Sequence, residues 1–148
     1  MATNIYYLVR HAEKANLVDP DTSISQAGQQ RAVALKDTLQ SKNITNIIVS
    51  GFKRTQQTAA PLENSIHVPH TVMDKDDIAK IIQRLRQFSH SLVVGHTDNV
   101  PLIIKKITGR SVTIAEDDFD NLYIITVKTV LGNKTKKLTK TTYGLPSP

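Results

Sequence analysis

Short apolar runs alternate with amphipathic segments over the first two thirds of the chain. Residues 5–9, 44–49 and 92–94 are rich in β-branched or aromatic side chains and end at polar residues or glycine. Such runs are typical of strands that are buried on both faces of a parallel sheet. The segments between them carry apolar residues at helical spacing. This alternation predicts an α/β fold in which helices cover both faces of a mostly parallel sheet.

Two helices are predicted to follow the first two strands. The first carries apolar residues at intervals of three and four, and it is expected to begin after a Ser25 cap and to stop by Asn43. The second is expected over residues 54–62. We predict that it ends near Pro61, because proline interrupts the hydrogen bonds of a helix interior.

Two more helices are predicted before the C-terminal third. An apolar face at helical spacing covers residues 78–85, behind acidic residues that suit a helix N-terminus. After residues 92–94, a further helix is expected to begin near Asn99, with Pro101 in its first turn and Gly109 beyond its end.

The C-terminal third has a different pattern. Residues 121–127 and 134–143 are strand-like and flank Gly132-Asn133, a two-residue turn signal, so we predict an antiparallel hairpin at one edge of the sheet. The chain of 148 residues has the size of one domain, and we expect a single domain over residues 1–148.

Composition excludes several classes of protein. The chain has no cysteine, which excludes a disulfide scaffold, thiolate metal sites and a cysteine nucleophile. No apolar run reaches the roughly 20 residues that span a bilayer, and residues 1–7 lack the regions of a signal peptide. We therefore expect a soluble cytoplasmic protein with no membrane partner, unless an export signal has been trimmed from its natural precursor.

The basic charge is concentrated in the predicted hairpin. Lysine and arginine number 19 against 13 acidic residues, a formal charge of +6, and five of these lysines lie in residues 128–140. Because this stretch lacks interleaved aromatic residues that could stack on bases, nucleic acid is a disfavoured partner. We expect the lysines to protect an exposed edge strand from pairing with another chain.

Arginine and histidine recur where the three predicted parallel strands end. The first strand is followed by Arg10 and His11, the second by Arg54, and the third by His96. Ligands of open α/β sheets bind beyond the carboxyl ends of the strands, so these side chains are expected to converge. Guanidinium groups match the oxygens of a phosphoryl group, and an imidazole among cations stays neutral and nucleophilic. We therefore expect His11 to attack phosphorus while Arg10, Arg54 and His96 stabilise charge without a metal ion.

At these residues the sequence resembles the histidine phosphatase superfamily, which includes the cofactor-dependent phosphoglycerate mutases. The family has a strand followed by Arg-His-Gly-Glu, a Leu-Thr-x-x-Gly-x-x-Gln-Ala helix start, a Ser-x-x-x-Arg-x-x-Gln-Thr-Ala segment and a Gly-His pair. Similar motifs occur here in the same order, at residues 7–13, 24–32, 50–59 and 93–96. The resemblance implies a three-layer α/β/α sandwich. It also implies that His11 is the phosphohistidine nucleophile and that Arg10, Arg54 and His96 form the phosphate pocket around it.

The general acid is not assigned by the resemblance. Larger family members carry a longer segment between the second and third strand ends, and this segment supplies a glutamate that protonates the leaving oxygen. Here the interval is short, and the candidates are Asp98, Glu13 and Asp74. We place Asp98 first because it follows His96 closely, although an aspartate at this position is equally a helix cap.

The resemblance implies a phosphatase that needs neither a metal ion nor a cofactor. Because compact family members resemble phosphohistidine phosphatases, we expect the substrate to be a phosphorylated protein side chain or a small phosphoester. The alternatives are a phosphotransferase of the phosphoglycerate mutase type and a phosphate-binding regulatory module without catalysis. His67 and His70 lack a third ligand in register for zinc, and the acidic residues 116–120 are interpreted as a solvated loop.

Overall fold

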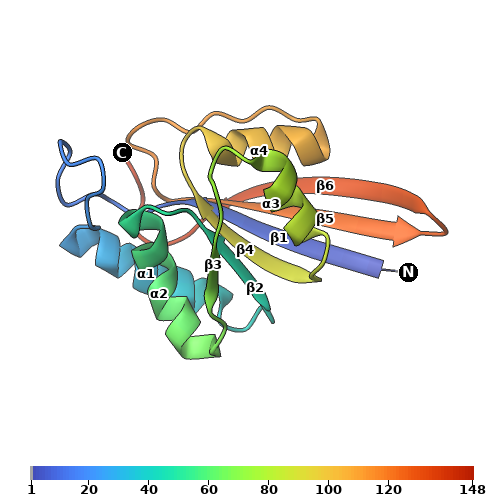
Figure 1. Ribbon diagram of the computed structural model, residues 1–148, viewed down its shortest axis with the longest axis horizontal. Helices are drawn as coiled ribbons and strands as arrows, with labels where there is room; N and C mark the ends of the chain where they lie inside the picture. The colour runs from blue at the N-terminus through green and yellow to red at the C-terminus, as the bar shows by residue number, and fades with distance from the viewer. Residues whose placement is uncertain (1) are drawn as a thin grey trace.

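The computed structural model describes residues 2–148, which form six strands and four helices (Figure 1). The strands are β1 (Ala2–Arg10), β2 (Asn46–Val49), β3 (His70–Val72), β4 (His90–Gly95), β5 (Asn121–Val130) and β6 (Asn133–Thr142). The helices are α1 (Gln26–Leu39), α2 (Lys53–Ile66), α3 (Ile78–Leu85) and α4 (Asn99–Thr108).

All six strands join one sheet in the order β3-β2-β4-β1-β5-β6. The first four of these are mutually parallel, whereas β5 pairs antiparallel with β1 and β6 pairs antiparallel with β5. The mostly parallel sheet and its antiparallel C-terminal hairpin confirm the predicted α/β architecture. The carboxyl ends of β1, β2 and β4 consequently lie at the same edge of the sheet.

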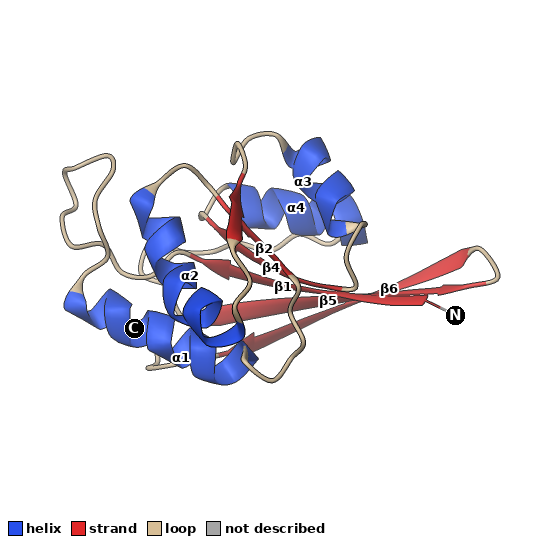
Figure 2. Ribbon diagram, turned by 60° about the horizontal axis from the view of Figure 1, so that its bottom comes forward, coloured by secondary structure: helices blue, strands red, loops and turns tan. Residues whose placement is uncertain are grey.

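Helices cover both faces of the sheet (Figure 2). Side chains of β1 alternate between the two layers: Tyr7 and Val9 belong to the core that includes residues of α1 and α2, whereas Tyr6 and Leu8 belong to the core with residues of α3 and α4. This alternation follows from the two-residue period of a strand. It explains why β1 is apolar at consecutive positions rather than at every second one.

The predicted helix boundaries are mostly confirmed. The Ser25 side chain accepts a hydrogen bond from the Gly28 amide at the start of α1, and α4 ends at Gly109 in the left-handed conformation. Helix α2, in contrast, does not stop at Pro61 but continues to Ile66. Leu62 follows the proline and is fully buried in the core, so tertiary packing offsets the hydrogen bond that proline cannot donate.

Two further features differ from the sequence prediction. Strand β3 was not predicted, because His70–Val72 is only three residues long and is partly exposed, which leaves no clear apolar period. The hairpin loop is Leu131-Gly132 rather than Gly132-Asn133. Both loop residues have positive φ, at 52° and 82°, as a type I′ turn requires, while Asn133 pairs with Val130.

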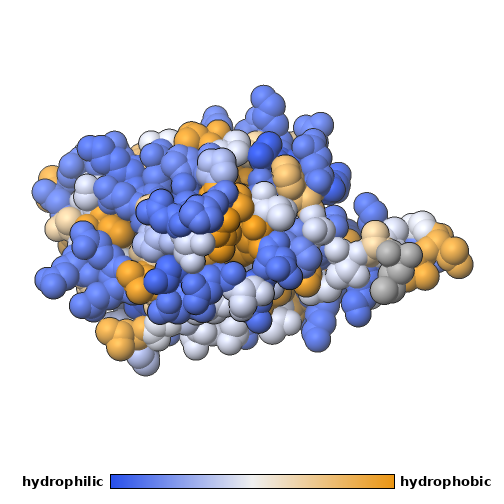
Figure 3. Space-filling view, turned by 90° about the horizontal axis from the view of Figure 1, so that it is seen from below, coloured by the Kyte–Doolittle hydropathy of each residue, from blue (hydrophilic) through white to orange (hydrophobic). Residues whose placement is uncertain are grey.

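The hairpin extends beyond the body of the molecule. Figure 3 shows apolar side chains at its tip, where Val130 and Leu131 are exposed. Among residues 2–148, no helix combines the length and the apolar character needed to cross a bilayer.

Candidate active site

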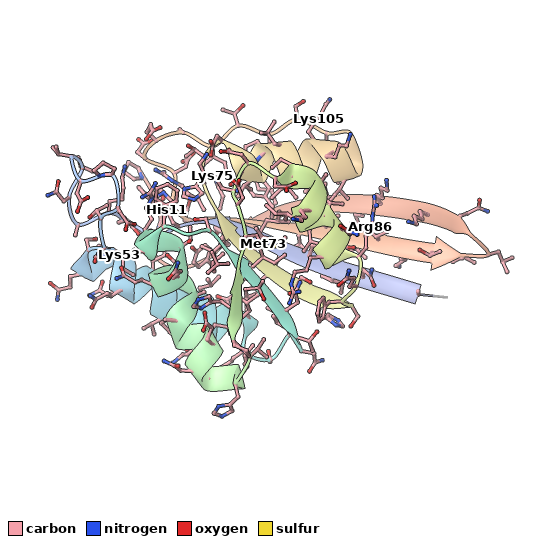
Figure 4. The ribbon with its side chains drawn as sticks, viewed as in Figure 1. His11, Lys53, Met73, Lys75, Arg86 and Lys105 are labelled. Atoms are coloured by element: carbon pink, nitrogen blue, oxygen red, sulfur yellow. The ribbon has the colours of Figure 1, made fainter. Side chains whose placement is uncertain are left out.

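The strand ends bring the predicted site residues together. Arg10 pairs with Gly95 in the register of β1 and β4, and the His11 amide donates to the Gly95 carbonyl oxygen at 2.8 Å. The rings of His11 and His96 therefore lie edge to face, with 5.5 Å between their centroids. Figure 4 places His11 at this edge of the sheet, near the start of α2.

His11 is buried, with 3% of its surface exposed, and is held in one tautomer. Its Nδ1 lies 2.8 Å from the Ala12 carbonyl oxygen, which can only accept, so Nδ1 carries the hydrogen and Nε2 keeps its lone pair. Burial lowers the pKa of His11 to about 3, and the positive charges of Arg10 and Arg54 act in the same direction. The imidazole is therefore neutral at pH 7 and has a free nucleophilic nitrogen.

Arg10 is fixed by the segment before β5. Its Nη1 donates to the carbonyl oxygens of Glu116 at 2.7 Å and Asp118 at 3.1 Å, and its guanidinium lies 4.0 Å from the Phe119 ring centroid. Residues 116–118 are thus more than a solvated loop: the Glu116 side chain is 88% exposed, but the backbone beneath it holds Arg10. Burial lowers the pKa of Arg10, yet its Nε has no hydrogen-bond partner among the described residues. A buried donor of this kind is available to a ligand oxygen.

Arg54 lies in the first turn of α2. Its Nη1 donates to the Pro20 carbonyl oxygen at 3.0 Å, and its guanidinium packs 4.5 Å from the ring centroid of Phe52. Burial lowers the pKa of Arg54, and its Nε is a second buried donor with no partner among residues 2–148. The site therefore contains two guanidinium groups, and the buried Nε of each has no hydrogen-bond partner among the described residues.

His96 contacts Ser50, the residue that follows β2. Its Nε2 lies 2.9 Å from Ser50 Oγ, and its backbone amide donates to Asn99 Oδ1 at 2.7 Å. Burial lowers the pKa of His96 to about 4, and the positive charge of Arg54 is the next largest cause of this lowering. A Cβ on Gly95 would lie 2.6 Å from Asn99 Oδ1, so only glycine allows this close approach of α4 to the strand end.

The Glu13 carboxylate is bound by Arg31 of α1. Both of its carboxylate oxygens accept from Arg31, at 2.8 Å and 3.0 Å. Arg31 also donates to the carbonyl oxygens of Tyr143 and Leu145 near the C-terminus. Glu13 thus takes part in an ion pair that connects three segments of the chain.

The other two acid candidates lie on the rim. Asp98 accepts from Lys75 Nζ at 2.6 Å and from the Asn99 amide at 2.9 Å. Burial disfavours its ionisation, but the Lys75 hydrogen bond and charge outweigh burial and lower the pKa of Asp98. Asp74 is exposed and accepts from the backbone amide of Asp76. Of these two carboxylates, Asp98 binds Lys75, whereas Asp74 accepts from its own loop.

Lys75 was missed by the sequence reasoning. It follows β3, the strand that was not predicted, and it reaches the same sheet edge as the other residues. Its position after a short β-branched segment, Thr71-Val72, was the only signal in the sequence. Among residues 2–148, no three His, Asp or Glu side chains gather as metal ligands would, and His70 contacts Glu63 instead of His67.

Comparison with solved structures establishes the fold. A putative alpha-ribazole-5'-P phosphatase from Escherichia coli str. K-12 aligns with a TM-score of 0.76 at 16% identity, covering 99% of this chain and 100% of that one. The protein histidine phosphatase SixA, solved with tungstate, aligns with a TM-score of 0.71 at 17% identity, covering 93% and 96%. A mycobacterial glucosyl-3-phosphoglycerate phosphatase aligns with a TM-score of 0.74 at 10% identity, covering 92% and 97%.

The sequence match is confined to the part of the chain that carries most of the motifs. No curated protein sequence matches significantly. Residues 6–76, however, match the family model of the histidine phosphatase superfamily, branch 1. This range contains the Arg-His segment, the start of α1 and the start of α2, whereas His96 lies beyond it. The motifs and the sheet topology agree with this match, so residues 6–76 of the chain resemble branch 1 of the histidine phosphatase superfamily.

Proposed function

We propose that this protein is a metal-independent phosphatase in which His11 carries the phosphoryl group. One observation supports this most strongly: a neutral, buried His11 has its Nε2 free beside two guanidinium groups with unpartnered nitrogens. Guanidinium groups supply the positive charge that a phosphoryl transition state requires. The proposed phosphate pocket consists of Arg10, His11, Arg54 and His96.

The proposed reaction has two displacements. His11 Nε2 attacks phosphorus, the bond from phosphorus to the leaving atom breaks, and the leaving atom keeps the electron pair and takes up a proton. Water then attacks the phosphohistidine and gives up a proton, and the P–Nε2 bond breaks to release orthophosphate and neutral His11. If Ser50 donates its hydroxyl hydrogen to His96 Nε2, His96 Nδ1 carries a hydrogen that can bind a phosphoryl oxygen.

We propose Asp98 as the group beside the leaving atom. Its ion pair with Lys75 favours the carboxylate, so Asp98 is a weak proton donor at neutral pH. A leaving imidazole needs less protonation than a leaving alkoxide. This supports a phosphohistidine side chain as the preferred substrate, with small phosphoesters as the other class, and it agrees with the fold likeness to SixA.

The ion pairs of Glu13 and Asp98 support one alternative function, a module that binds phosphate without catalysis. Glu13 and Asp98 are both engaged by basic side chains, at Arg31 and Lys75. A module that binds phosphate without catalysis would need no free acid. The two functions differ in turnover, since the module would bind inorganic phosphate and would form no phosphoenzyme.

The test is phosphoenzyme formation with a phosphohistidine peptide, a panel of small phosphoesters and 3-phosphoglycerate. The wild type is expected to form an acid-labile phosphoenzyme and to release orthophosphate, and His11→Ala is expected to do neither. His67→Asn is the matched control, because His67 is an exposed histidine that follows α2 with positive φ, which asparagine tolerates. Full activity in His11→Ala would overturn the proposal. Phosphate binding without turnover in the wild type would favour the module, and mutase products from 3-phosphoglycerate would favour the phosphotransferase.

A further inference from the structure

A second concave site lies near the amino end of β1, away from His11. We call it the cationic hollow. Its polar lining residues are Asn4, Tyr6, Arg86, Thr129, Lys134 and Lys136, and its apolar ones are Ile82, Ile107 and Val127. Figure 4 shows Arg86 beyond the end of α3, on the side of the hairpin, whereas His11 lies at the opposite end of the sheet. The hollow is thus separate from the proposed active site.

Strand register explains which lysines face the hollow. Lys136 pairs with Val127, and Lys134 pairs with Thr129. Val127 packs against the core beneath α3 and α4, so its cross-strand neighbours on that face point toward these helices. Lys137 is adjacent to Lys136 and therefore points to the other face. Lys134 and Lys136 are therefore the lysines of β6 that line the hollow with Arg86.

The polar lining is dominated by hydrogen-bond donors. Arg86, Lys134 and Lys136 supply three positive charges, and the lining includes no carboxylate. Within residues 2–148, none of the three forms a salt bridge within 4.0 Å. Tyr6 is only 3% exposed, and its hydroxyl accepts from Asn4, which leaves the hydroxyl hydrogen free to donate. This combination of cations and a buried hydroxyl favours a ligand that is rich in acceptor oxygens.

Structural roles account for only part of this arrangement. The negative end of the α3 dipole favours a cation at Arg86. Protection of the β6 edge favours lysines anywhere along the strand, on either face. Neither effect requires three like charges to share one hollow, where their mutual repulsion is unfavourable. An anionic ligand would remove that repulsion.

We propose that the cationic hollow binds a small phosphorylated molecule with two or more negative charges. The phosphate oxygens would bind Arg86, Lys134, Lys136 and the Tyr6 hydroxyl. The apolar residues Ile82, Ile107 and Val127 form a wall for an uncharged part such as a ring. This site would act independently of the phosphatase reaction at His11.

The test is an NMR titration of the full chain with inorganic triphosphate and, in a second arm, with ADP. Backbone amides at residues 127–136 report the hollow, and those at residues 10–12 and 95–97 report the proposed active site. In the wild type, at least one probe is expected to shift the hollow amides saturably at physiological ionic strength. The triple variant Arg86→Gln, Lys134→Gln, Lys136→Gln is expected to lose about tenfold or more in affinity at these amides.

The matched control is Lys128→Gln combined with Lys137→Gln. These lysines belong to the same hairpin, but their side chains point to its other face, so the hollow is expected to keep its affinity in this variant. A tighter fit of ADP than of triphosphate would indicate that the apolar wall contributes. Equal losses in the triple variant and the control would overturn the proposal, because binding would then follow net charge alone. Shifts with an RNA oligonucleotide but with neither small probe would overturn it as well.

Discussion

At the scale of single residues, the main feature is an imidazole that stays uncharged among positive groups. His11 and His96 are both buried, and burial is the largest cause of their low pKa values, about 3 and about 4. Nearby arginines act in the same direction because a second positive charge would be repelled. A neutral His11 keeps the lone pair that the proposed reaction needs.

This protonation state predicts an acid-sensitive fold. In the unfolded chain a histidine binds its proton near pH 6.5, whereas native His11 and His96 bind one only near pH 3 and 4. Their contribution to stability is therefore complete above about pH 6.5 and is lost as the pH falls. Each is expected to lower the free energy of unfolding by up to roughly 1 kcal/mol per pH unit in the middle of this window. Urea unfolding between pH 4 and pH 7 measures this slope.

The variant His11→Asn tests whether His11 contributes to this acid sensitivity, because it removes one of the two buried histidines. Its slope is expected to be shallower than that of the wild type. His67→Asn, which replaces an exposed histidine, is the matched control. An identical slope in His11→Asn and the wild type would show that His11 is not the source of the acid sensitivity.

At the scale of elements, the segment before β5 acts as a support for Arg10. Its backbone carbonyl oxygens at Glu116 and Asp118 accept from one guanidinium nitrogen, and the Phe119 ring covers the guanidinium plane. These contacts fix Arg10 while leaving its Nε free. Phe119 is therefore a positioning residue in the proposed function.

Replacing Phe119 tests this role. Phe119→Leu is expected to weaken the binding of inorganic phosphate and to lower kcat/KM for the proposed reaction by about tenfold, since a cation–π contact that is shielded from water contributes up to about 2 kcal/mol. Phe119→Tyr keeps the ring and is expected to restore both values. If tyrosine and leucine were equally impaired, the ring would not be what positions Arg10.

The hairpin turn gives a prediction about stability. Leu131 has φ of 52° and is 97% exposed, so it is strained without any compensating burial. Leu131→Asn is expected to raise the free energy of unfolding by about 0.5–1 kcal/mol, because asparagine tolerates the left-handed conformation. Urea denaturation measures the change. Val130→Asn, at a strand position beside the turn, is not expected to stabilise the fold.

At the scale of the whole molecule, Arg31 links segments that are far apart in sequence. From α1 it binds the Glu13 carboxylate beyond β1 and the carbonyl oxygens of Tyr143 and Leu145 near the C-terminus. Arg31 is buried, so the loss of its side chain would leave several polar groups without partners. The C-terminal segment is thereby connected to the loop that follows His11.

Arg31→Ala is expected to lower the free energy of unfolding by about 3 kcal/mol, since it breaks a largely buried ion pair. Lys36→Ala is the control: its pair with Asp37 lies on the surface, and a loss below about 1 kcal/mol is expected. Chemical denaturation of both variants provides the comparison. Equal losses at the two positions would contradict a central role for Arg31.

Local patterns predicted most of the elements. The apolar runs predicted β1, β2 and β4, and Ser25 and Gly109 marked real helix boundaries. These signals succeed because capping and side-chain periodicity act within about four residues. Strand β3 and the continuation of α2 past Pro61 lacked such signals, since both depend on neighbours supplied by the tertiary structure.

By itself the sequence determined the fold class and the edge of the sheet at which arginines and histidines meet, because parallel strands deliver the residues that follow them to one side. Only the tertiary structure decided what each charged side chain contacts: Glu13 binds Arg31, Asp98 binds Lys75, and Arg10 rests on a segment more than 100 positions away. These partners depend on strand order and loop paths, which bring distant residues together. No local pattern of apolar and polar positions records such pairings.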